Sequence, residues 1–223
     1  MRVEVPHEWP DTAEAARRIQ DELAPLVEIG GSGPDSVSTI AGLDVSYAGD
    51  RLAAAVVVLD TESLEVVAAS TARGTAAFPY IPGLFAFREL PTLIEALRGL
   101  EMTPDLLVCD GYGVAHPRRF GLACHLGVLT GLPAIGVGKT AFVGRAGEPG
   151  IERGAGSDLV DAGEVVGRAL RTQRGVKPVY VSAGHRIGLD AACRHVLAAA
   201  PRYRLPETTR RADRLSRDLL GRT

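Results

Sequence analysis

The sequence lacks the paired cysteines, the long apolar runs and the charged-then-apolar leader that mark several classes of protein. Its three cysteines, Cys109, Cys124 and Cys193, have no paired spacing, which excludes a zinc knuckle and a disulfide framework. No apolar run approaches the length that spans a bilayer, and no secretory leader opens the chain. We therefore expect a cytoplasmic protein that makes no membrane contact and whose cysteines act as small apolar residues.

Lysine is also scarce, because Lys139 and Lys177 are the only lysines among 25 basic residues. The net charge of −2 hides an asymmetry: residues 1–110 carry 7 basic and 18 acidic side chains, whereas residues 111–223 carry 18 and 9. A basic half suits a polyanion held against a metal, although charge counts alone favour ordinary solvated helix faces. The length of 223 residues predicts one domain, residues 1–223, which we expect to be a monomer.

The first half of the chain predicts a helix followed by an antiparallel meander. Residues 11–28 show the apolar spacing of a helix, which we expect to pack on the core. The turn-rich stretch 30–35 follows, and three strand-like segments then alternate with turns at 37–47, 52–60 and 64–73. Such closely spaced strands indicate hairpin connections rather than crossovers.

The second half alternates between helix and strand. The predicted elements are a helix from about 86, a strand at 106–110, a helix at 118–130, a strand at 134–137, strands at 164–171 and 178–182, and helices at 189–199 and 207–220. No helix or strand is predicted for the glycine-rich stretch 144–157. This order predicts an α/β, ribonuclease-H-like fold, in which a three-strand meander joins parallel strands in a mixed sheet flanked by helices.

Two aspartates interrupt apolar runs that otherwise read as buried strands. Asp44 follows residues 39–43, and Asp110 follows residues 106–109. A buried carboxylate costs several kcal/mol unless a cation or hydrogen bonds compensate it. Either aspartate alone is most simply explained as a strand-ending or capping residue. The pair, on strands far apart in the sequence, predicts one shared divalent metal ion.

Two further carboxylates and a lysine lie on elements that such a sheet brings near. Glu89 stands early in a predicted helix, where the helix dipole alone would favour an acid. Asp213 stands among arginines on the last helix, where a surface ion pair is the simplest alternative. Carboxylate oxygens are the ligands that Mg²⁺ prefers, and such an ion can activate water. Lys139, after an apolar strand, could hold the water or the scissile phosphate.

The segment around Lys139 also resembles the end of a phosphate-binding P-loop. That motif requires a glycine at residue 133, which here is Pro133. The acidic strand also precedes the lysine, whereas a nucleotide-binding core usually places it afterwards. Both observations exclude the nucleotide-binding interpretation.

Two loops have compositions that suit nucleic-acid recognition. The first, residues 78–85 (the wedge loop), is stiffened by prolines and displays Tyr80, which could part base steps or stack on a base. The second, residues 110–117 (the aspartate loop), has glycines that let a ligand approach the backbone, with His116 nearby. Ordinary loops more often pack such aromatics into the core, and a lone histidine is more often structural.

These motifs together resemble the endonuclease V family of inosine-directed repair nucleases. The resemblance runs in order from about residue 10 to residue 217. It is carried by the segments at 42–47, 79–83, 87–91, 110–113, 116–117, 136–139, 184–187, 203–207 and 211–213.

The resemblance implies a DNA repair endonuclease that hydrolyses the second phosphodiester bond 3′ to a deaminated base, in DNA or in inosine-containing RNA. It implies Mg²⁺, with Mn²⁺ as a substitute, and 3′-hydroxyl and 5′-phosphate products. By motif, Asp44 and Asp110 bind the metal, and Glu89, Asp213 and Lys139 complete the catalytic set. The residues implied to contact nucleic acid are Pro79, Tyr80, Ile81, Pro82, Gly83, Leu84, Gly111, Gly113 and His116.

The chain departs from the family pattern at a few positions. Tyr112 replaces a polar residue between two glycines, Gly138 replaces an alanine, and Ala183 and Thr208 replace prolines. Two other interpretations remain open. One is a different ribonuclease-H-like nuclease, such as a junction resolvase or a hybrid nuclease. The other is a non-catalytic nucleic-acid binder.

Overall fold

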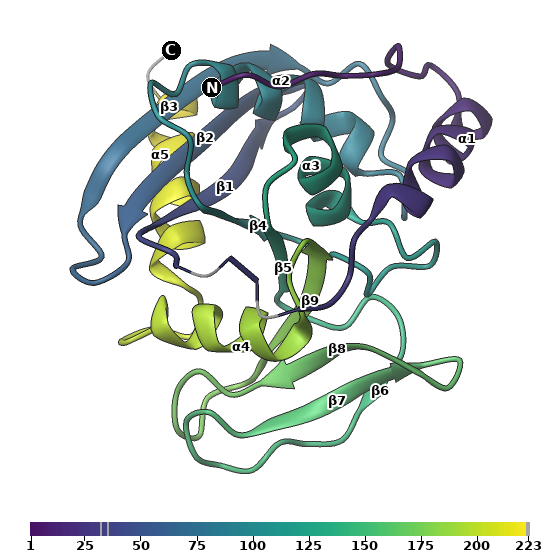
Figure 1. The fold of residues 1–223 in the computed structure, drawn as a ribbon. Coiled ribbons are helices and arrows are strands. Elements are labelled where there is room, and N and C mark those ends of the chain that lie inside the picture. The colour runs from purple at the N-terminus through teal and green to yellow at the C-terminus, as the bar shows by residue number, and fades with distance from the viewer. Residues whose placement is uncertain (32, 35, 222–223) are drawn as a thin grey trace.

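The meander forms one end of a mixed sheet in the computed structural model, which describes residues 1–31, 33–34 and 36–221. Within that part of the chain the sheet has nine strands in the order β3-β2-β1-β4-β5-β9-β8-β7-β6 (Figure 1). The strands are β1 (Thr39–Ala48), β2 (Arg51–Asp60), β3 (Val66–Thr75), β4 (Leu106–Asp110), β5 (Ala134–Gly138), β6 (Arg145–Ala146), β7 (Gly156–Asp161), β8 (Glu164–Leu170) and β9 (Val179–His185).

The pairing of the central strands confirms the ribonuclease-H-like arrangement. β2 pairs antiparallel with both β1 and β3, while β4 pairs parallel with both β1 and β5. The run 52–59 of β2 is buried throughout because helices cover both faces of the sheet there. A parallel pair needs a crossover connection, and α2 supplies the one between the meander and β4.

Helices cover the two faces of the sheet and divide the core into two layers (Figure 1). The helices are α1 (Ala13–Leu23), a short 3-10 turn η1 (Ala24–Leu26), α2 (Ala86–Arg98), α3 (Leu122–Thr130), α4 (Leu189–Ala198) and α5 (Glu207–Gly221). α2 and α3 pack on one face, around Leu43 and Leu107, whereas α4 and α5 pack on the other, around Ile40 and Val108. Among the described residues, no helix is both long and apolar enough to cross a bilayer.

Helix α1 packs on the loop that precedes α2. Thr12 caps the helix by accepting a hydrogen bond from the Ala15 amide at 3.2 Å, and Pro25 ends its regular turns. Ala16 is fully buried against Phe78 and neighbouring residues of the wedge loop. The chain N-terminal to β1 therefore supports the wedge loop from behind.

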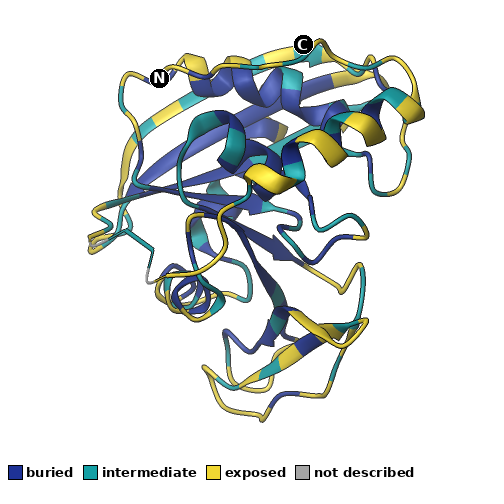
Figure 2. Cartoon of the chain, turned by 45° about the vertical axis from the view of Figure 1, so that its right-hand side comes forward, coloured by how far each residue is buried: buried dark blue, intermediate teal, exposed yellow. Residues whose placement is uncertain are grey.

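The structure differs from the sequence prediction in the second half of the sheet. The stretch 144–157, for which no strand is predicted, contains β6 and the first residues of β7. β7 is mostly exposed, with Leu159 its only buried residue, so its sequence carries little apolar signal (Figure 2). Helix α3 begins at Leu122 rather than near residue 118, after turns at 116–119. In the turn-rich stretch 30–35, Ser32 and Asp35 lie outside the described residues.

Gly42 brings strand β1 unusually close to helix α5. A Cβ atom at residue 42 would lie 2.1 Å from the carbonyl carbon and oxygen of Thr208, in the first turn of α5. The helix can therefore lie directly against the strand that carries Asp44 only because residue 42 has no side chain.

We predict that Gly42→Ala lowers the free energy of unfolding by about 1–3 kcal/mol, because the methyl group must push the backbone of α5 away from β1. Urea denaturation of purified protein measures this change. Gly221→Ala is the matched control, since no heavy atom lies within 4 Å of the position that its methyl group would take, and it should change stability by less than about 0.5 kcal/mol. Equal effects of the two substitutions would contradict the close packing of β1 on α5.

Candidate active site

The pairing of β1 with β4 brings Asp44 and Asp110 to the same edge of the sheet. Leu43 is paired with Cys109 in the parallel register, so the two aspartates are the next residues on adjacent strands. Neighbouring strands lie about 4.8 Å apart. Both aspartates line the same cavity. The predicted convergence of these carboxylates therefore follows from strand register.

Asp44 lies in a partly buried position with several negative neighbours. Its Oδ2 accepts a hydrogen bond from the Ser216 hydroxyl of α5 at 2.9 Å. Burial raises the pKa of Asp44 to about 6, the negative charges of Asp110 and Asp213 add to this increase, and the Ser216 hydrogen bond opposes it. The site thus disfavours a second uncompensated negative charge.

Lys139 forms an ion pair with Asp110. Its Nζ lies 2.5 Å from Asp110 Oδ2. Burial alone would lower the pKa of Lys139, but its hydrogen bond with Asp110 and the charges of Asp44 and Asp213 raise the pKa overall. Lys139 directly follows β5, which pairs parallel with β4, so sheet order brings it beside Asp110.

Glu89 lies in the first turn of α2, as the helix-dipole alternative expects, but it is buried, with only 5% of its surface exposed. Its Oε1 accepts a hydrogen bond from the Tyr47 hydroxyl at 2.7 Å. Burial raises the pKa of Glu89 to about 8; the Tyr47 hydrogen bond opposes this change, and the charges of Asp44 and Asp110 reinforce it. In the metal-free protein Glu89 therefore holds a proton near neutral pH.

Asp213 extends from α5 toward the same edge of the sheet. It lines a hollow together with Asp44, Asp110 and Lys139. It also forms an ion pair with Arg217 at 2.8 Å, as the surface alternative expected. Both interpretations of this residue are thus compatible with the geometry.

These acidic side chains do not form a ready-made metal cage. In the described ranges, no three His, Cys, Asp or Glu side chains are grouped closely enough to hold a metal ion. Asp44, Glu89 and Asp110 each have a polar partner instead: Ser216, Tyr47 and Lys139, respectively. The donor set nevertheless fits a hard divalent cation: burial raises the pKa of Asp44 and Glu89, neighbouring carboxylates raise it further, and a cation would favour the charged carboxylates.

A cavity of about 470 Å³ opens beside the carboxylates. The wedge loop and the aspartate loop form two of its walls, with Gly83 at φ +82° and Gly111 at φ +152°, conformations that favour glycine. The lining residues include Asp44, Tyr47, Tyr80, Pro82, Gly83, Glu89, Asp110, Gly111, Tyr112, His116, Leu122, Gly138, Lys139 and Phe142.

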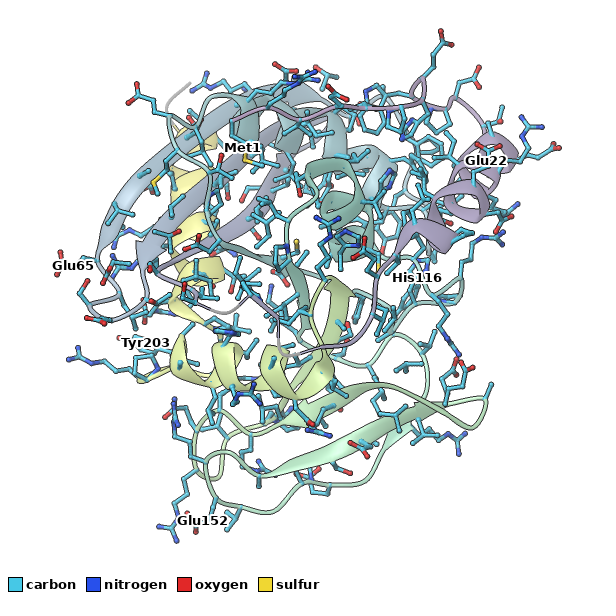
Figure 3. All side chains as sticks on the ribbon, in the orientation of Figure 1. Met1, Glu22, Glu65, His116, Glu152 and Tyr203 are labelled. Atoms are coloured by element: carbon cyan, nitrogen blue, oxygen red, sulfur yellow. The ribbon has the colours of Figure 1, made fainter. Side chains whose placement is uncertain are left out.

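His116, which is labelled in Figure 3, connects the two loops. Its Nε2 lies 3.0 Å from the Gly83 carbonyl oxygen, and its Nδ1 accepts a hydrogen bond from the Arg118 amide at 3.2 Å. Burial lowers the pKa of His116 to about 4, so the ring is neutral at pH 7 and donates to Gly83 through Nε2. Gln20 of α1 donates to the same carbonyl at 2.9 Å.

The wedge-loop residues have different environments. Tyr80 is 72% exposed at the rim of the cavity, and Pro79 and Pro82 are also exposed. Ile81 and Leu84 instead pack onto the apolar cluster beneath the loop, so they support its shape. Gly113, in the aspartate loop, is buried, and a Cβ atom there would lie 1.9 Å from the Ala183 carbonyl oxygen.

Sequence reasoning missed the side chains that hold the carboxylates. Ser216 has no distinguishing motif beyond its place three residues after Asp213. Tyr47 lies within the segment 42–47 that carries the family resemblance, but its partner is 42 residues away. A single sequence gives no signal for such a pairing.

A larger hollow of about 1070 Å³ extends from Asp110 and Lys139 along α5. It is bordered by the β2–β3 turn, including Glu65, and by Tyr203, which lie near each other in Figure 3. Its basic side chains are Lys139, Arg202, Arg210, Arg211, Arg214 and Arg217. The guanidinium of Arg210 lies 3.6 Å from the ring centroid of Tyr203, a cation–π contact.

Both the family model and the similar proteins that match this chain are described as endonuclease V. Residues 21–214 match the family model described as Endonuclease V. Endonuclease V of Streptomyces avermitilis is 56% identical over 221 residues, covering 98% of this chain and 96% of that protein. Endonuclease V of Nocardia farcinica is 57% identical over 213 residues, covering 95% and 94%.

Solved structures show the same similarity. The crystal structure of the Streptomyces avermitilis protein has a TM-score of 0.93 with 55% identity and covers 99% of this chain and 98% of that one. The human endonuclease V structure has a TM-score of 0.83 with 35% identity, covering 94% and 98%. A Ciona intestinalis endonuclease V, solved in complex with a 24mer DNA containing an inosine followed by a ribo-adenosine, has a TM-score of 0.81 with 27% identity, covering 93% and 97%.

The burial of Glu89 generates a pH-dependent prediction. Its pKa rises from 4.5 to about 8 in the folded protein, so wild-type protein loses stability as pH rises through this window. Gln cannot ionise, so Glu89→Gln in EDTA should match wild type at pH 4 and exceed its unfolding free energy at pH 9 by about 2 kcal/mol or more. Urea denaturation at both pH values measures this.

The control for that experiment is Glu95→Gln, since Glu95 is exposed on the same helix. It should alter stability by less than about 0.5 kcal/mol at either pH. If Glu89→Gln shifted stability equally at pH 4 and pH 9, Glu89 would not be held in its protonated form.

Proposed function

The chain belongs to the endonuclease V family, and from this premise we propose that it is a DNA repair endonuclease acting on deaminated bases. We propose that it hydrolyses the second phosphodiester bond 3′ to deoxyinosine, leaving a 3′-hydroxyl and a 5′-phosphate. The observation that supports this best is a cavity walled by Tyr80, Gly83 and Gly111 that opens directly onto Asp44 and Asp110. An extruded base and the cleaved bond would thus lie within one continuous hollow.

Inosine-containing DNA is the proposed partner because a structural neighbour from Ciona intestinalis is bound to it. Extruding a base costs a few kcal/mol, and less for a weakly paired base such as hypoxanthine. The cavity of about 470 Å³ is of a size that holds small organic groups. Inosine in RNA is a further proposed substrate.

We propose that Tyr80 fills the gap that the extruded base leaves. Its ring is exposed at the cavity rim, and the prolines at 79 and 82 limit the conformations of the loop. The loop is supported by α1 and by the contact between His116 and Gly83. A pre-ordered aromatic wedge lowers the entropy lost on binding.

Asp44 and Asp110 are the proposed ligands of a divalent cation, Mg²⁺ with Mn²⁺ as a substitute, and Glu89 and Asp213 assist them. When bound, the cation would activate water and neutralise charge on the phosphodiester. Lys139, which carries a positive charge, donates to a phosphate oxygen beside Asp110. The Tyr47 hydroxyl holds Glu89 Oε1 in a fixed orientation.

The arginines along α5 are proposed to track the nucleic-acid backbone. Arg202, which precedes α5, and Arg214, which lies on α5, line the larger hollow beside Lys139 and are exposed. Phosphate contacts of this kind supply sequence-independent affinity that falls with salt. For the whole protein, we propose a cytoplasmic monomer of one domain, and its three buried free cysteines fit a reducing compartment.

The proposed function is tested by nicking of end-labelled oligonucleotides, single- and double-stranded, that carry one inosine. We expect Mg²⁺-dependent cleavage one nucleotide 3′ to the inosine and none in EDTA. Matched substrates with adenine, four-way junctions and RNA–DNA hybrids are the controls. Preferred cleavage of junctions or hybrids would instead indicate another ribonuclease-H-like nuclease.

Asp110→Ala separates binding from cleavage. We expect this variant to cleave at least about 10³-fold more slowly, because it loses a proposed metal ligand and the partner of Lys139. A gel-shift assay should show that it still binds the inosine duplex. Cleavage at the wild-type rate would show that Asp110 is not needed for the reaction.

Tyr80→Ala tests the wedge. Base stacking on an aromatic ring contributes about 1–3 kcal/mol, so affinity for the inosine duplex should fall about 5- to 150-fold. The affinity of the variant for single-stranded inosine substrate should fall less, because a single strand has no gap in a base stack for Tyr80 to fill. Val165→Ala, which removes an exposed apolar side chain from β8, should leave binding unchanged. Equal losses for single strand and duplex would exclude the wedge role.

A further inference from the structure

Lys139 lies on a segment that follows the end of β5 and is not part of the sheet. β5 ends at Gly138, and residues 139–141 are exposed and irregular. A cationic side chain on such backbone loses conformational freedom when it is fixed, so neighbouring groups must hold the segment in place. Arg204 holds one side by donating to the Lys139 carbonyl oxygen at 2.5 Å.

Tyr112 contacts the residues on both sides of Lys139. Its ring lies against Gly138, and its hydroxyl donates to the Thr140 carbonyl oxygen at 3.1 Å. It also stacks on Phe142, with ring centroids 5.3 Å apart and an interplanar angle of 27°. One side chain therefore binds three alternate residues of the segment.

The ring of Tyr112 is itself anchored. It packs on the apolar cluster of Ala115, Leu159 and Val166, which joins the aspartate loop to β7 and β8. Tyr112 also stands two residues after Asp110, the ion-pair partner of Lys139. The same short loop thus fixes both members of the ion pair.

Tyr112 explains why residue 138 is glycine. A Cβ atom there would lie 2.5 Å from Tyr112 Cε1 and 3.0 Å from the Thr140 carbonyl oxygen. Gly138 is absent from the positive-φ residues of the chain, so its backbone conformation does not demand glycine. Glycine is required at residue 138 because the Tyr112 ring and the Thr140 carbonyl oxygen leave no space for a side chain.

We propose that Tyr112 is a positioning residue for Lys139, and that Gly138 is required because the Tyr112 ring occupies the space of a side chain. The two residues form a complementary pair whose packing sets where the Lys139 ammonium meets the phosphate. This inference rests on the proposed function, since Lys139 acts there on the scissile phosphodiester.

A double-mutant cycle tests the pair on inosine oligonucleotides with Mg²⁺. Gly138→Ala should lower kcat about 10- to 100-fold in the wild-type background, because small displacements of catalytic groups have effects of this size. In the Tyr112→Ala background the same change should alter kcat less than about twofold. Tyr112→Phe, which loses only the hydrogen bond to Thr140, should lower kcat about threefold.

Two readouts separate positioning from general destabilisation. In a Lys139→Ala background, Tyr112→Ala should lower kcat less than about twofold further, because the residues act as a unit. KM should change less than about twofold in each variant. Tyr180→Phe is the control, since Tyr180 packs on the same apolar cluster outside the cavity lining, and it should leave kcat unchanged.

Equal effects of Gly138→Ala with and without Tyr112, or equal effects of Tyr112→Ala with and without Lys139, would overturn the inference while leaving the proposed function intact. A wild-type protein that does not nick inosine substrates would instead overturn the proposed function.

Discussion

A group of carboxyl groups confined in a partly buried space at one edge of the sheet is the constraint around which the site is arranged. Parallel pairing of β1 and β4 forces Asp44 and Asp110 together, and Glu89 adds a third carboxyl group. Burial raises the pKa of Asp44 and Glu89, and neighbouring negative charges raise it further. Each carboxyl group has a polar partner. The Ser216 hydroxyl donates to Asp44 and the Tyr47 hydroxyl donates to Glu89. The Lys139 ammonium group donates to Asp110.

The arrangement ties the site closely to the packing of the fold. Ser216 can reach Asp44 because α5 lies directly on β1, and that approach requires Gly42. Tyr47 reaches Glu89 because the meander and α2 share one core layer. The orientation of these carboxyl groups therefore depends on how the helices pack on the sheet.

The sequence predicts what depends on local pattern. Closely spaced strand-like segments and turn chemistry indicated the meander, and the interrupted apolar runs placed Asp44 and Asp110 on two strands, which the structure pairs with each other. β6 and β7 were missed because exposed strands carry little apolar signal. The partners of the carboxylates, Ser216 and Tyr47, were missed because pairing across the fold depends on tertiary packing that periodicity does not encode.

The shared position of Asp110 and Lys139 has a topological consequence. Three hollows of the described surface meet at these two residues: the cavity beside the wedge loop, the hollow along α5 and a third hollow beside Asp213. A chain-like ligand that contacts these two residues can therefore extend from them into more than one hollow. Threading of a free terminus is unnecessary, which is the geometric condition for acting at an interior link of a long strand.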